Sequence, residues 1–134
     1  MGEWYDIGVT VGIGVAAGVA FAGVLAGLRF GFAATLLGAV IVGVAAGLLV
    51  NGWTGAIGGI VGSVSAATVV RGAGRRGATV GGTALLLVGA AVVIGLLALI
   101  PVVGYVEAVV LPGLAARRAR RTPDKYEGLR SLAK

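Results

Sequence analysis

The sequence contains no cysteine and no histidine and has few charged residues, and each of these absences excludes a class of protein. Without cysteine or histidine, the chain has no disulfide, no thiol nucleophile and neither of the usual zinc ligands. Charged residues make up 12% of the chain, about half the share found in an ordinary soluble domain. Because a small domain has a large surface for its volume, so little charge argues against a soluble globule.

The chain is instead rich in apolar residues and glycine. Hydrophobic residues make up 58% of its 134 residues, and 26 residues are glycine. Intrinsic disorder requires low hydrophobicity, and collagen requires glycine at every third position, so both are excluded. We therefore predict an all-α fold in the form of a polytopic transmembrane helical bundle. The expected location is the plasma membrane of a prokaryote.

Apolar runs define the expected spans. Three runs are close to the roughly 20 residues that cross a hydrocarbon core, and they cover residues 7–28, 30–50 and 53–70. A fourth run, 78–116, would be about 58 Å long as a single helix, so it must break. Proline interrupts helices, and Pro101 therefore predicts a fourth full span at 78–100 and a short fifth segment at 102–116, which either crosses the membrane or re-enters it.

The cations select between four and five crossings. Cytoplasmic loops collect lysine and arginine. Five crossings place all 11 cations on one side, whereas four crossings place seven on one side and four on the other. We therefore predict five crossings, with the N-terminus outside and a basic cytoplasmic tail at 117–134. Within this tail, Thr122-Pro123 predicts the start of a short helix that ends near Ala133.

Small residues four positions apart recur through the first three spans. Helices in lipid associate by close backbone contact at such positions, so these spans are expected to form a tight Gly-xxx-Gly bundle and the bulkier fourth span to face lipid. The same faces could instead join copies of the chain into a homo-oligomer. One pentapeptide, Gly-Val-Ala-Ala-Gly, occurs at both 14–18 and 43–47. Composition bias explains this repeat better than an inverted duplication does.

Glu107 is the one acidic residue within a long apolar run. An ionisable residue inside a membrane predicts a functional site, here a cation or proton site. The alternative is an acid that reaches the interface or bonds to a neighbouring threonine or backbone group. Most intramembrane hydroxyls are expected to bond to the carbonyl three or four residues earlier, although Ser63 and Ser65 lie near mid-span and could line a polar path.

The arginines beside the spans predict contacts with anionic lipid head groups. They lie in a glycine-rich loop and at the start of the tail: Arg71, Arg75, Arg76, Arg117, Arg118, Arg120 and Arg121. No aromatic platform accompanies them, so nucleic acid is not an expected partner.

These features favour a non-catalytic protein without a cofactor. One intramembrane acid cannot supply the paired carboxylates of a hydrolase. We expect a small membrane scaffold or interaction subunit that touches anionic lipid and associates with a membrane protein or a second copy of itself. The alternative is a small channel or transporter with Glu107 on a cation or proton path.

Overall fold

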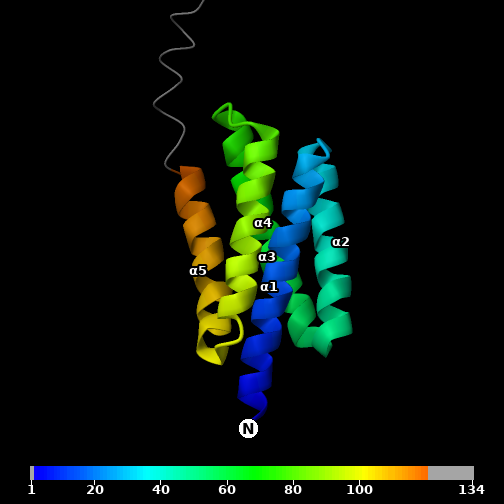
Figure 1. Cartoon of the computed structure of the whole chain (residues 1–134), viewed down its shortest axis with the longest axis vertical. Coiled ribbons are helices and arrows are strands. Elements are labelled where there is room, and N and C mark those ends of the chain that lie inside the picture. The colour runs from blue at the N-terminus through cyan, green and yellow to red at the C-terminus, as the bar shows by residue number, and fades with distance from the viewer. Residues whose placement is uncertain (1, 121–134) are drawn as a thin grey trace, which may run out of the picture.

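The computed structural model describes residues 2–120, apart from the side chains at positions 51, 101 and 119. This part of the chain contains five α-helices and no strand: α1 (Glu3–Gly27), α2 (Phe32–Asn51), α3 (Trp53–Arg75), α4 (Val80–Leu97) and α5 (Pro101–Arg120). The helices run alternately up and down the bundle, so α1, α3 and α5 are parallel (Figure 1). Helices α1 to α4 are each long and apolar enough to cross a membrane, which confirms the predicted fold class.

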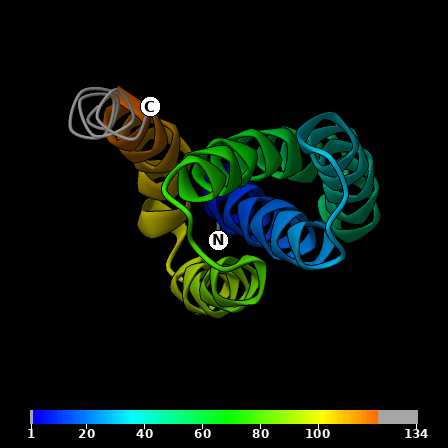
Figure 2. The ribbon, with the colours of Figure 1, turned by 90° about the horizontal axis from the view of Figure 1, so that it is seen from above.

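Helix α1 is the centre of the bundle. Viewed from above, α2, α3, α4 and α5 are arranged around it (Figure 2), and each of them packs against it. Its valines Val11, Val15 and Val19 are buried and form the hydrophobic core together with Leu87 and Ile94 of α4. Outer faces of α2 and α4 are exposed and carry leucine, isoleucine and valine side chains, which is the surface expected to meet lipid.

The predicted break in the long apolar run is confirmed. Helix α4 ends at Leu97 and α5 begins at Pro101. Proline is tolerated at the first position of a helix because its missing N–H would have no partner within the helix there. Gly104 follows inside α5, where it serves packing.

The helix ends differ from the predicted spans in two places that affect the site. Helix α3 continues to Arg75, so Arg71 lies in the helix, and the prediction that it belongs to a loop is wrong. Glycine at 72 and 74 suggested a loop, but the last turns of α3 accommodate both residues. Helix α5 likewise continues to Arg120, four residues past its expected end at 116. Arg121 and the tail helix predicted at 123–133 lie outside the described residues.

Glycines of α3 bring its backbone directly against two other helices. A methyl group on Gly58 or Gly62 would collide with the backbone of Val11 or Val15 in α1. A methyl group on Gly59 would collide with the backbone of Gly43 in α2. Such close approach is the usual way for helices to gain van der Waals contact in lipid.

The repeated pentapeptide contributes to this packing. Gly14 of α1 and Gly47 of α2 both lie against the backbone of Gly55. One turn further along α3, Gly18 and Gly43 both lie against Gly59. The two copies of the pentapeptide, on the antiparallel helices α1 and α2, therefore pack against the same two turns of α3.

Candidate functional site: Glu107 and the arginine-rich end

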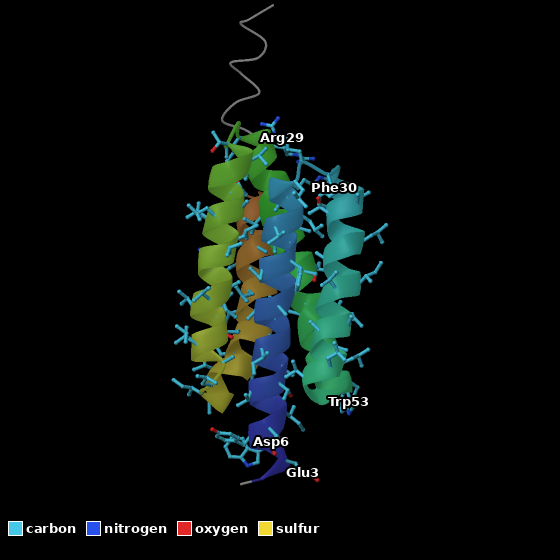
Figure 3. The ribbon with its side chains drawn as sticks, turned by 45° about the vertical axis from the view of Figure 1, so that its right-hand side comes forward. Glu3, Asp6, Arg29, Phe30 and Trp53 are labelled. Atoms are coloured by element: carbon cyan, nitrogen blue, oxygen red, sulfur yellow. The ribbon has the colours of Figure 1, made fainter. Side chains whose placement is uncertain are left out.

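Glu107 is buried within the bundle. Its side chain is 8% exposed, although it lies on α5, which is otherwise largely exposed along its outer side. It follows the first residue of α5 by six positions, or about 9 Å along the helix axis. It therefore lies nearer the end of the bundle that carries Glu3, Asp6 and Trp53 (Figure 3).

The carboxylate of Glu107 has no hydrogen-bond partner. Both oxygens, Oε1 and Oε2, are inaccessible to solvent and unpaired within the described structure. The interpretation that the carboxylate bonds to a neighbouring threonine or backbone group is therefore wrong, whereas its placement near a membrane interface stays a prediction. A buried polar group without a partner costs about 1–3 kcal/mol, and a charged one costs more.

Close helix packing one turn earlier fixes the position of Glu107. A methyl group on Gly104 would collide with the backbone carbonyl of Gly8 in α1. A methyl group on Gly12 would come within 2.5 Å of Ala98 Cβ and 3.2 Å of Gly104 Cα. This contact packs α5 closely against α1, and it places Glu107, three residues further along α5, in the contact region between α5 and the rest of the bundle.

A second contact ties α5 to the start of the chain. The hydroxyl of Tyr105 donates a hydrogen bond of 2.9 Å to the carbonyl oxygen of Trp4. The two residues are 101 positions apart, so the sequence alone does not predict this contact. The hydrogen bond joins α5 to the first turn of α1 at the end of the bundle nearest Glu107.

The hydroxyls of Thr10, Ser63, Thr68 and Thr83 bond to a carbonyl three or four residues earlier, as predicted. Ser63 donates to Gly59, Thr68 to Ser65 and Thr83 to Thr79. Ser65 differs because its hydroxyl is buried and unpaired. Since Ser63 faces α2 and two residues rotate a helix by about 200°, Ser65 faces away from α2.

The described arginines gather at the end of the bundle opposite the N-terminus. Arg29 lies in the α1–α2 turn at that end, with Glu3 and Asp6 at the other (Figure 3). Arg75 and Arg76 follow at the end of α3, and the last turn of α5 adds the exposed Arg117, Arg118 and Arg120. The guanidinium of Arg71 lies 5.0 Å above the ring of Phe32, a cation–π contact that directs Arg71 toward the start of α2.

The described bundle has clear electrostatic polarity, with arginines at one end and Glu3 and Asp6 at the other. No group of three acidic, histidine or cysteine side chains that could hold a metal occurs among residues 2–120. Comparison with known proteins finds no matching protein family, curated protein or solved structure.

Proposed function

We propose that this chain is a small non-catalytic membrane protein that acts as a scaffold or interaction subunit. Its arginine-rich end faces the cytoplasm and binds anionic lipid head groups, and its N-terminus faces outward. The observation that carries the orientation is the separation of charge: the arginines of the helix ends lie at one end of the bundle, and Glu3 and Asp6 at the other. Cytoplasmic surfaces favour arginine, and anionic lipids attract it.

The packing of the first three helices supports a scaffold. Most glycines of α1, α2 and α3 lie against another helix of the same chain, with Gly74 near the end of α3 as an exception. We therefore expect these three helices to form a rigid unit. Large apolar side chains cover the outside of the whole described bundle, among them Leu49 of α2, Leu85 of α4 and Val109 of α5, which are 88%, 75% and 76% exposed. A partner helix or a second copy of the chain would bind one of these faces.

Site-specific photo-crosslinking in the native membrane tests the scaffold. A photoreactive residue replaces Leu49, Leu85 or Val109 in turn, and the same three variants without irradiation are the controls. We expect one face to give a discrete protein adduct, whose mass distinguishes a second copy from another protein. Lipid adducts alone at all three positions would contradict the scaffold.

A second candidate function is conduction or transport of a cation or proton through Glu107. The unpaired, buried carboxylate oxygens favour it, because ionisable residues inside membranes commonly mark ion pathways. In proteoliposomes, Glu107→Gln is expected to reduce ion flux or alter its pH dependence, whereas Asp6→Asn at the exposed end is the matched control. Absence of flux through the wild-type protein would exclude this candidate and leave the scaffold untouched.

A further inference from the structure

We infer that Glu107 is a binding site for a single positive charge, either a proton or a monovalent metal cation, held at the interface of α5 with the rest of the bundle. The inference shares Glu107 with the second candidate function, but it concerns binding alone and does not require the ion to move across the membrane.

The first argument is the cost of an isolated charge. Both carboxylate oxygens are buried and unpaired within the described residues. An ionised carboxylate in such a place has lost its hydration and has no hydrogen bond or ion pair to compensate for that loss. A positive charge that neutralises the group removes most of this cost, and either a proton or a small cation supplies it.

The second argument is that residues 2–120 provide no positive charge at the level of Glu107. Helix α5 packs against α1 and α3, and neither α1 from Ile7 to Gly27 nor α3 from Trp53 to Val70 carries a charged residue. The nearest arginine on α5, Arg117, is ten residues or about 15 Å along the helix. Helix α4 carries no charged residue at all.

The remaining titratable groups on these helices lie toward the two ends. At the near end are Glu3, Tyr5 and Asp6 of α1 and Tyr105 of α5, whose hydroxyl is bonded to Trp4. At the far end are Arg71 and Arg75 of α3 and the arginines of the last turn of α5. The acids at the near end attract cations, and this end is the shorter route to Glu107.

The third argument is that the position of Glu107 is built by packing. The contacts of Gly104 with Gly8 and Gly12 set the separation of α5 from α1. Backbone contacts therefore determine the position of Glu107, so removing the charge of its carboxylate should leave the packing of α5 against α1 unchanged. Glu107→Gln retains the shape of the side chain and is the appropriate variant.

Infrared spectroscopy measures the occupant directly. A neutral carboxyl group and a carboxylate have separate C–O stretching bands, and an alkyl maltoside micelle avoids the ester carbonyls of lipid. The protein carries Gln or Asn in place of its other four side-chain acids, Glu3, Asp6, Asp124 and Glu127. The difference spectrum against the same protein with Glu107→Gln then isolates Glu107.

At neutral pH in choline chloride, free of sodium and potassium, we expect the band of a neutral carboxyl. If sodium or potassium chloride converts this band to the carboxylate form, the occupant is the metal cation, and if the band persists, the occupant is the proton. A carboxylate band that is the same in all three salts would overturn the inference. A neutral band without ion flux would exclude transport and leave the binding site established.

Discussion

The hydroxyl of Ser63 in α3 lies 2.8 Å from the carbonyl oxygen of Ala39 in α2, and it lies 2.7 Å from the carbonyl of Gly59 in its own helix. The hydroxyl is fully buried. Its single proton is shared between the two carbonyls, so this serine makes a hydrogen bond within α3 and another to α2. It lies one turn from Gly59, whose backbone packs closely against Gly43.

Ser63→Ala is expected to destabilise the protein because it removes this interhelical bond. Such bonds contribute about 0.6 kcal/mol on average in a membrane and up to about 1.7 kcal/mol. Ser65→Ala is the matched control, since its hydroxyl is equally buried but unpaired, and its removal should be neutral or slightly stabilising. Unfolding in mixed micelles measures both variants, and equal losses would contradict the assignment.

Glycine substitutions should divide sharply by position. Gly59→Ala places a methyl group on the backbone of Gly43 and should cost about 1–3 kcal/mol through overpacking, whereas a methyl group at Gly89 meets nothing within 4 Å. Gly89→Ala should therefore be neutral or stabilising by up to about 1 kcal/mol, through the helix propensity of alanine. The same unfolding assay tests the pair. A Gly59→Ala protein as stable as the wild type would show that α2 and α3 are further apart than the contacts described above.

Replacement of Glu107 by leucine should stabilise the protein. The carboxylate makes no hydrogen bond, so an apolar side chain of similar size removes a desolvation cost of about 1–3 kcal/mol. Thr35→Val provides the contrast, because the buried Thr35 donates a hydrogen bond of 3.2 Å to the Phe30 carbonyl. Its replacement by valine should lower the free energy of unfolding by about 1 kcal/mol. A marked loss of stability in Glu107→Leu would indicate that the carboxylate has a structural partner.

Single cysteines should report the orientation without background, since the chain has no cysteine. In intact cells, an impermeant maleimide is expected to label Glu3→Cys. It should label Gly74→Cys and Arg120→Cys after the cells are permeabilised. Labelling of Gly74→Cys and Arg120→Cys from opposite sides would show that α5 does not complete a crossing.

Anionic lipid should bind the arginine-rich end. Joint replacement of Arg75, Arg76 and Arg117 by glutamine is expected to weaken the preference for phosphatidylglycerol over phosphatidylcholine, since each arginine near a charged leaflet contributes about 1 kcal/mol. Native mass spectrometry of retained lipid measures the preference. Replacement of Glu3 and Asp6 by glutamine and asparagine, at the other end, is the control, and an equal effect from both sets would contradict a localised contact.

Much of the architecture could be predicted because membranes constrain sequence strongly. The apolar runs gave the spans, and Pro101 gave the break, since proline cannot continue a helix without loss of a hydrogen bond. The helix ends were less predictable. Arg71 follows a valine pair and precedes Gly72, a pattern typical of a loop, but its contact with Phe32 depends on where α2 begins.

Glu107 could be named as a candidate from the sequence, but its surroundings in the fold could not be predicted. Scarcity of charge singled out Glu107, yet its burial follows from the contact of Gly104 with Gly8, and spacing within one helix does not reveal which helix will be its neighbour. For the same reason, neither the Tyr105–Trp4 hydrogen bond nor the central position of α1 could be predicted from the sequence. Glycine pairs in the sequence indicate that a helix is closely packed, but they do not indicate its partner.

The central place of α1 has a consequence for biogenesis. Each later helix packs against at least one helix that precedes it: α2 on α1, α3 on both, α4 on α1, and α5 on α1 and α3. Segments emerge from the ribosome in this same order, so each helix inserted after α1 finds a helix that it packs against already in place. Translation can therefore guide assembly, and a nascent chain stopped at Gly77 already contains both copies of the repeated pentapeptide and the helix that they hold.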